Sequence, residues 1–164
     1  MSVRTGFIGV GAMGSPMALN ILKAGIPLVV HDVDENKTIE HEKAGAEVVY
    51  SPMEVANASD RTICLVETTR QVEEVICGER GIIHGAKPGH IVICMSTIDP
   101  TVAKRIASDL LLQEILMLDA PVSGGTARAQ AADLTVIAGG EKTVFDQCKD
   151  CLLYTSPSPR DSIA

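Results

Sequence analysis

The sequence is poor in aromatic residues: it has no tryptophan, two phenylalanines and two tyrosines among 164 residues. A core built on large aromatic side chains is therefore excluded, and aliphatic residues must fill most of the interior. Such a composition suits a parallel β-sheet covered by helices, because its central strands are aliphatic on both faces. The chain has the length of one domain. It also lacks any apolar run near the roughly 20 residues of a membrane-spanning helix, so we expect no membrane partner.

An excess of positive charge and a disulfide framework are missing as well. The formal net charge is −7, which argues against a nucleic-acid partner. The five cysteines are odd in number and lack the spacing of a secreted disulfide scaffold. Cys64 and Cys94 lie in apolar runs and are predicted to be buried, whereas Cys148 and Cys151 form a lone CxxC without a second pair of metal ligands. Because the N-terminus has no signal-peptide pattern, we expect a cytoplasmic protein, with the mitochondrial matrix as the alternative.

Strand-like and helix-like segments alternate along the chain. The predicted strands are residues 4–10, 27–32, 47–49, 61–66, 90–95, 115–118 and 134–138. The predicted helices are residues 12–24, 35–44, 70–77, 99–110 and 141–148, together with a short one that Ser51 caps and Pro52 begins. Repeated βα units indicate an α/β fold with a mostly parallel sheet, right-handed crossovers and helices on both faces.

The first strand leads into a glycine-rich turn. Gly9, Gly11 and Gly14 form a GxGxxG pattern after an apolar strand and at the start of a helix, which is the context that a dinucleotide-binding motif requires. These glycines permit a tight turn, close approach of a pyrophosphate, and close packing of the helix on the strand. The pattern predicts a doubly wound, Rossmann-type fold. The predicted cofactor-binding turn consists of Gly9, Val10, Gly11, Ala12, Met13 and Gly14.

An acidic residue follows at the expected distance. Asp32 ends the second predicted strand, 23 residues after Gly9. A carboxylate at this position can accept hydrogen bonds from the adenosine ribose and repels a 2′-phosphate. No arginine follows it directly, since the sequence continues with Val33 and Asp34. We therefore predict NAD as the cofactor, with NADP less favoured.

Three segments together resemble the 3-hydroxyisobutyrate dehydrogenase family of β-hydroxyacid dehydrogenases. They are residues 6–25, the segment from Met95 to Pro100, and the segment from Asp119 to Gly125. The family includes tartronate semialdehyde reductases and is related to 6-phosphogluconate dehydrogenases. The resemblance spans about residues 3–150. It implies an oxidoreductase that oxidises a 3-hydroxy acid to its semialdehyde with NAD, or catalyses the reverse reduction.

The resemblance also implies cofactor contacts. Thr97 follows the strand 90–95 at a carboxyl end, where ligands bind in open α/β sheets, and is expected to contact the cofactor; the alternative is a plain helix-entry residue. Val66 and Glu67 correspond to a family leucine–proline pair that lines the cofactor groove, with Glu67 in place of the proline. Gln71 matches a polar position that contacts the cofactor.

A second glycine motif is expected to bind the substrate. By the resemblance, Ser123, Gly124 and Gly125 contact a small carboxylate substrate. Backbone N–H groups of consecutive glycines can form a concave anion site, and the Ser123 hydroxyl adds a further donor or acceptor. The alternative is an ordinary glycine turn between two elements.

The residue that handles the hydroxyl proton has no counterpart in this sequence. In the family it is a lysine in a Gly-x-Gly…Lys-x-x-Asn-Asn segment, which starts the helix into an all-helical second domain. No lysine here lies in that context, so we assign no catalytic residue and no metal ligand. His31, His41, His84 and His90 are expected at the surface or at strand ends. We expect a truncated domain that binds NAD without catalysis, from a parent enzyme that forms a homo-oligomer.

The C-terminal segment differs in character from the rest. Residues 151–164 have no periodicity, and two prolines in three residues would end a helix there. The segment resembles the translation of a sequencing adapter. We predict that residues 1–150 form the NAD-binding domain and that residues 151–164 are a non-native or disordered tail. Two other functions stay open: an NADP-linked enzyme like 6-phosphogluconate dehydrogenase, and a non-catalytic NAD-binding module.

Overall fold

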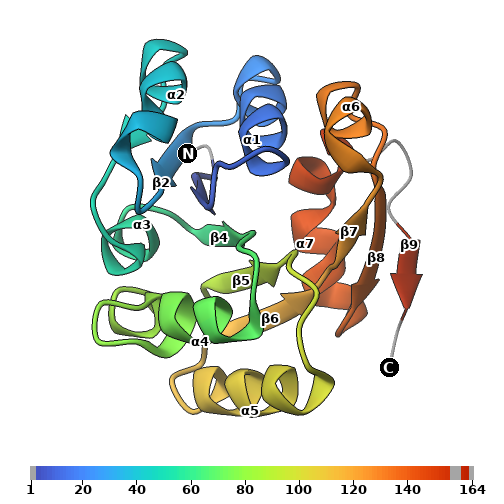
Figure 1. The fold of residues 1–164 in the computed structure, drawn as a ribbon. Coiled ribbons are helices and arrows are strands. Elements are labelled where there is room, and N and C mark those ends of the chain that lie inside the picture. Colours follow the sequence, from blue (N-terminus) through green and yellow to red (C-terminus); the bar gives the residue numbers. More distant parts are fainter. Residues whose placement is uncertain (1–2, 156–159, 163–164) are drawn as a thin grey trace.

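The computed structural model describes residues 3–155 and 160–162, and a β-sheet runs through them (Figure 1). Its strands are β1 (Thr5–Ile8), β2 (Leu28–His31), β3 (Glu47–Val48), β4 (Arg61–Cys64), β5 (Ile91–Cys94), β6 (Leu116–Asp119), β7 (Val122–Ser123), β8 (Thr135–Gly139) and β9 (Arg160–Ser162). The order across the sheet is β3-β2-β1-β4-β5-β6-β8-β7, and β9 pairs with β8. Strands β1 to β6 are parallel to one another, whereas β8 is antiparallel to β6 and β7 and parallel to β9.

Helices cover both faces of this sheet. They are α1 (Gly14–Lys23), η1 (Glu35–Thr38), α2 (Ile39–Lys43), α3 (Pro52–Asn57), α4 (Thr69–Cys77), η2 (Ile82–His84), α5 (Pro100–Leu111), α6 (Gly125–Gln130) and α7 (Lys142–Leu153). Strand order and layers confirm the doubly wound, Rossmann-type α/β fold. In the part of the chain that the structure describes, no helix is both long and apolar enough to cross a membrane.

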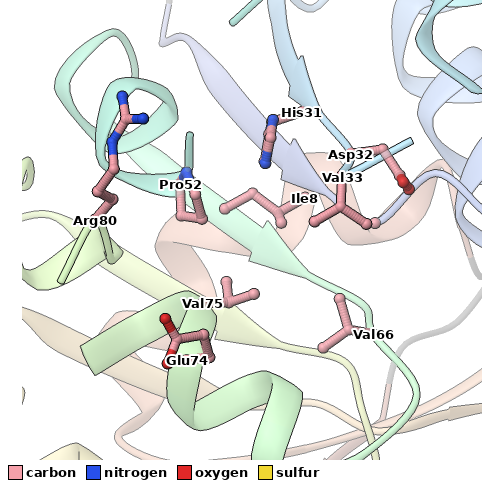
Figure 2. Close-up of a pocket in the computed structure, with 10 residues that line it drawn as sticks. Ile8, His31, Asp32, Val33, Pro52, Val66, Glu74, Val75 and Arg80 are labelled. Atoms are coloured by element: carbon pink, nitrogen blue, oxygen red, sulfur yellow. The ribbon is translucent and has the colours of Figure 1, made fainter. Parts of the chain in front are cut away.

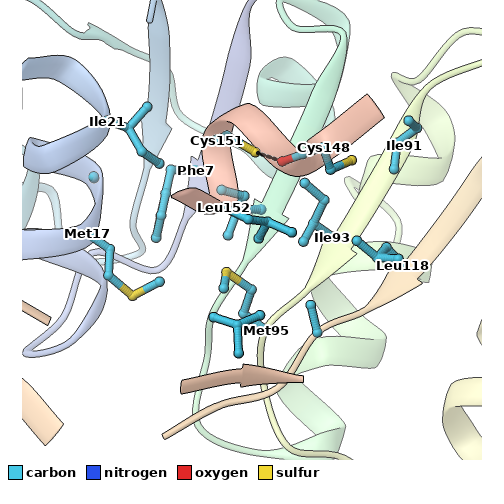
Figure 3. Packing of buried hydrophobic residues seen from close by; sticks show 14 of the residues in the cluster. Phe7, Met17, Ile21, Ile91, Ile93, Met95, Leu118, Cys148, Cys151 and Leu152 are labelled. Carbon is cyan, nitrogen blue, oxygen red and sulfur yellow. Dashed lines mark hydrogen bonds between the residues drawn. The ribbon is translucent and has the colours of Figure 1, made fainter. Parts of the chain in front are cut away.

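The core is aliphatic and divides into two clusters, one on each face of the sheet. Phe7 and Ile63 lie in the cluster that α1, α6 and α7 cover, whereas their neighbours Ile8 and Cys64 lie in the cluster beneath α3, α4 and α5. This alternation follows from the pleat of a strand, which points successive side chains to opposite faces. Figure 3 shows part of the first cluster, where residues of α1 and α7 meet those of the strands. Cys64 and Cys94 are fully buried, as predicted.

Four short elements were not predicted: β7, β9, α6 and the 3₁₀ helix η2. The predicted helix 35–44 is also divided, because η1 is a separate 3₁₀ turn that Asp34 caps by accepting from the Asn36 N–H. The last helix, α7, continues past Cys148 to Leu153. Cys151 and Leu152 are fully buried. The boundary at residue 150 and the origin of residues 151–164 stay predictions, and residues 156–159 and 163–164 of that segment lie outside the described residues.

The prediction for one histidine is wrong. His41 is fully buried in α2, because its ring packs against the start of α1, with Nε2 3.2 Å from the Ser15 hydroxyl. His84 is exposed, whereas His31 ends β2 and His90 directly precedes β5, as expected. Polar neighbours in the sequence of α2 gave no sign that this position faces another helix.

Candidate functional site

The predicted site residues gather at the edge of the sheet formed by the carboxyl ends of its parallel strands. The register aligns Ile8 with His31 on one side and with Cys64 on the other, and Cys64 with Cys94. The strand order reverses between β1 and β4, and open α/β sheets bind ligands in the crevice at such a switch point. The turn after β1 and the loops after β2, β4 and β5 all open onto this crevice.

The glycine turn has the geometry that its motif predicts. Gly9 has φ +98°, in the left-handed region that favours glycine, and its N–H donates to the His31 carbonyl at 3.1 Å. A side chain at Gly14 would place its Cβ 1.9 Å from the Gly9 carbonyl oxygen. Both glycines are therefore required by the fold of the turn.

Gly11, the second glycine of the motif, has a different environment. A Cβ built at Gly11 meets no atom within 4 Å, so the backbone there faces open space. The N–H groups of Gly11, Ala12 and Met13 donate to no acceptor within residues 3–155. The helix that follows has no side-chain cap at Met13 and no acidic residue in its first turn. Free amides and the positive end of a helix dipole make this turn suited to an anion.

Asp32 lies directly after β2, next to the turn. One carboxylate oxygen accepts from the Val10 N–H at 3.0 Å, and the other accepts from the Asp34 N–H at 2.9 Å. The carboxylate therefore fixes the turn relative to the end of β2. Each oxygen retains a lone pair for a further donor, so hydroxyl groups of a ligand can still bind here.

A cavity of about 240 Å³ extends from Asp32 along the α3 and α4 side of the crevice. Figure 2 shows aliphatic side chains between the polar groups at its two ends. The lining residues are Ile8, Gly9, His31, Asp32, Val33, Pro52, Val66, Glu74, Val75 and Arg80. A flat, mostly apolar group such as a nucleobase matches this mixture of surfaces. Of the predicted site residues, the cavity brings together Gly9, Asp32 and Val66.

Ser96 is a site residue that sequence reasoning missed. Its side chain is buried, and its hydroxyl donates to the Val66 carbonyl at 2.7 Å and accepts from the Val66 N–H at 2.9 Å. It thereby joins the loop after β4 to the loop after β5. The only signal in the sequence was its place beside Thr97, between an apolar strand and a helix cap.

The other predicted residues of these loops are exposed. The Gln71 side-chain oxygen accepts from the N–H groups of Glu67 and Thr68, at 3.0 Å each, in a capping box with Thr68 at the start of α4. This leaves the Gln71 amide nitrogen for another partner. Thr97 lies between the buried Ser96 and Asp99, which caps α5 by accepting from the Thr101 N–H. Contact of Glu67, Gln71 and Thr97 with a cofactor stays a prediction.

The second glycine motif lies beside the loop after β5. The Val122 N–H donates to the Met95 carbonyl at 3.3 Å, so β7 and the residues after it border the crevice. Gly124 has φ +139° and Gly125 has φ +76°, and both are exposed with Ser123. Close by, burial raises the pKa of Asp119, at the end of β6. The geometry permits an anion-binding turn, and the substrate contacts of these three residues stay predictions.

Comparison with known proteins identifies the family of the chain. The model of the NAD binding domain of 6-phosphogluconate dehydrogenase matches residues 4–157. Mitochondrial 3-hydroxyisobutyrate dehydrogenase of Mus musculus is 40% identical over 147 residues, which is 90% of this chain and 44% of the mouse protein. The 2-(hydroxymethyl)glutarate dehydrogenase of Eubacterium barkeri is 35% identical over 151 residues, which is 92% of this chain and 50% of that protein.

A solved structure agrees with these relatives. The 3-hydroxyisobutyrate dehydrogenase of Mycobacterium tuberculosis, in a structure with L-serine, superposes with a TM-score of 0.92 and 28% sequence identity. The match covers 100% of this chain and 55% of that chain, so this chain spans about half the length of its relatives. The chain therefore belongs to the family of the NAD binding domain of 6-phosphogluconate dehydrogenase, and it resembles the 3-hydroxyisobutyrate dehydrogenases within it.

Proposed function

We propose that this chain is the NAD-binding domain of an enzyme that interconverts a small 3-hydroxy acid and its semialdehyde. The observation that carries the proposal is the turn at Gly11. Its amides are free, open space lies above the glycine, and Asp32 stands beside it. A dinucleotide's pyrophosphate would lie on these amides, and its adenosine ribose would donate to Asp32.

The charges around the crevice favour NAD over NADP. Asp32 would lie close to the 2′ position of the ribose, where a phosphate would meet a carboxylate. Among the residues that line the cavity, the one cation is Arg80. It lies at the opposite end of the cavity from Asp32 (Figure 2).

The chemistry divides between the cofactor and the protein. When bound, the nicotinamide ring accepts or donates the hydride. We propose that Ser123, Gly124 and Gly125 hold the substrate carboxylate, and that Thr97 lies against the cofactor. No residue of this chain is assigned the proton transfer, which by the resemblance belongs to a lysine at the start of the helical domain. The names of the relatives support a 3-hydroxy acid, and L-serine in the M. tuberculosis structure is one.

A titration with two cofactors tests the proposal. The protein is titrated with NADH and NADPH while the fluorescence of the reduced nicotinamide is followed. We expect tighter binding of NADH. We expect Asp32→Asn to weaken NADH binding by about tenfold, because a charge-assisted hydrogen bond is lost. The variant should also show a smaller difference in affinity between NADH and NADPH. Asp34→Asn is the matched control, because this nearby carboxylate is exposed and caps η1. Tighter binding of NADPH by the unmodified chain would refute the assignment.

A further inference from the structure

We propose that His31 recognises the base of the dinucleotide, with its Nε2 accepting a hydrogen bond from the 6-amino group of adenine. The inference rests on the proposed NAD-binding function and adds a specificity-determining residue to it. It makes the site selective for adenine over purines that carry a 6-carbonyl group.

One hydrogen bond determines the tautomer of the neutral ring. His31 Nδ1 lies 3.1 Å from the Val49 carbonyl oxygen. A carbonyl can only accept, so Nδ1 must carry the proton. In the neutral imidazole the other nitrogen is then an acceptor. Nε2 therefore presents a lone pair and no hydrogen.

The backbone holds this ring in place. The Val49 N–H donates to the Val30 carbonyl at 3.0 Å, which extends the pairing of β2 with β3 and fixes the carbonyl that orients the ring. The His31 carbonyl in turn accepts from the Gly9 N–H. Only 8% of His31 is exposed. The main chain of His31 is therefore bonded to the turn that would bind the pyrophosphate, and its ring is oriented by Val49.

The free nitrogen belongs to a ring that lines the cavity. The hydrogen bond of the His31 ring within the described chain is made by Nδ1. Nε2 is not among the buried atoms without a partner, so it is accessible from the cavity. Around the ring the cavity is apolar, with Ile8 and Pro52 close by in Figure 2. An acceptor in such surroundings gains from a ligand donor and is destabilised by a ligand acceptor.

The position of His31 in the strand suits contact with a base. Asp32 points toward the glycine turn, where its carboxylate meets Val10, and its neighbour His31 points to the other face, into the cavity. A ribose held by Asp32 would direct its base between the side chains of Val33 and Val66, which line the cavity. Adenine presents an N6–H donor on its edge, whereas hypoxanthine presents a carbonyl oxygen at the same place.

Two other polar groups line the same cavity. Glu74 could accept from adenine, and Arg80 could donate to a 6-carbonyl; both are exposed. His31 is favoured over Glu74 because its acceptor is oriented by Val49 and lies next to Asp32 in the chain. The experiment must therefore distinguish recognition of adenine by His31 from recognition by Glu74.

The test compares NADH with its reduced hypoxanthine analogue, followed by nicotinamide fluorescence. We expect the unmodified protein to bind NADH about tenfold more tightly, because the analogue leaves His31 facing another acceptor. His31→Phe keeps a ring of similar size and removes the acceptor. The ratio of the affinity for NADH to the affinity for the analogue should therefore fall to about one. His31→Gln, which can donate as well as accept, should also lower it. Glu74→Gln and His84→Phe should keep the original ratio.

Each outcome has one meaning. Equal affinities in the unmodified protein overturn the role of His31, as does a ratio that persists in both His31 variants or that is lost in Glu74→Gln alone. Absence of NADH binding by the folded, unmodified protein instead defeats the proposed cofactor function. Circular dichroism establishes that each variant is folded.

Discussion

Gly11 matters to the ligand, whereas Gly14 matters to the fold. Because open space surrounds a Cβ built at Gly11, we expect Gly11→Ala to leave the free energy of unfolding nearly unchanged. The added methyl group would stand where the pyrophosphate approaches the amides, so NADH affinity should fall by at least about tenfold, or about 1.4 kcal/mol. Fluorescence titration and urea unfolding measure the two effects.

Gly14→Ala is the contrasting variant. Its methyl group would meet the Gly9 carbonyl oxygen at 1.9 Å, so the turn must shift. The midpoint of urea unfolding should drop clearly for this variant and hardly at all for Gly11→Ala. Comparable losses of stability in the two variants would contradict the distinction.

His90 makes the stability of the fold sensitive to acid. The side chain is buried, and its Nε2 lies 2.8 Å from the Thr62 hydroxyl. Burial lowers its pKa from 6.5 to about 4, although Asp60 and the Ser59 backbone act in the opposite direction. Between these two values the unfolded chain binds a proton that the folded chain does not. Stability is therefore lost as pH falls from 6.5 to about 4, by roughly 3 kcal/mol in all.

A non-titrating variant checks this source of acid sensitivity. We expect His90→Gln, which keeps a hydrogen-bonding group near Thr62, to flatten the fall in unfolding free energy across this pH window. Urea unfolding of both proteins at several pH values gives the comparison. If the two curves run parallel, His90 is not the titrating group.

At the scale of elements, a buried cation joins α7 to the sheet. Arg61, at the start of β4, is 3% exposed in its side chain. Its guanidinium binds both Asp150 carboxylate oxygens, at 2.5 and 2.8 Å, and donates to the Gln147 carbonyl and the Thr5 hydroxyl. The hydrogen bond from Arg61 lowers the pKa of Asp150. The hydrogen-bond partners of Arg61 thus come from strand β1 and helix α7.

We expect Asp150→Asn to destabilise the protein because it leaves a buried cation without a counter-charge. Since Asp150 is 56% exposed and water can partly replace it, the loss should be about 2 kcal/mol, below that of a fully buried pair. Asp146→Asn breaks only the exposed pair with Lys142 and should cost less than about 0.5 kcal/mol. Urea unfolding compares them, and equal effects would exclude a special role for Asp150.

Elements with an apolar pattern or a clear cap were predictable from the sequence, including the short strand β3 and the short helix α3, whereas several other short elements were not. Periodic apolar residues and caps located β1, β2, β4, β5 and the helices α1, α4 and α5 to within a few residues. The predicted cap at Ser51 is confirmed, since its hydroxyl accepts from the Glu54 N–H. By contrast, β7 has two residues and β9 three, too few for any period to show. Helix α6 begins at Gly125, which has a positive φ. In the sequence, consecutive glycines at this point indicate a turn and not the start of a helix.

Tertiary contacts explain the remaining differences. In α2 the apolar Ile39 is 47% exposed, whereas the polar His41 is fully buried, because the neighbouring α1 and not local hydropathy decides which face turns inward. The glycine turn and Asp32 could be predicted, because their spacing in the sequence is typical of a single βαβ unit. The roles of Ser96 and His31 depend on Val66 and Val49, which are distant in sequence, and no local pattern encodes such pairs.

At the scale of the whole molecule, α7 closes one face of the core. Cys151, Leu152 and Thr155 are fully buried, and the Thr155 carbonyl accepts from the Leu134 N–H at 3.1 Å. We expect truncation after Asp150 to lower the free energy of unfolding by about 3 kcal/mol or more, the usual cost of emptying a large aliphatic site. Truncation after Thr155, which keeps α7 whole, should cost less. If the Asp150 truncation unfolds like the full chain, residues 151–155 do not support the core.

The hydroxyl of Ser96 bonds to both the donor and the acceptor of Val66, so one side chain takes the place of a further rung between β4 and β5. The loops that follow these strands cannot separate without breaking both bonds. The Ser96 hydroxyl therefore holds the Val66 side of the cavity to the segment that leads to Thr97. The Asp99 N–H, which donates to the Thr69 hydroxyl at 3.2 Å, joins the same two segments at a second point.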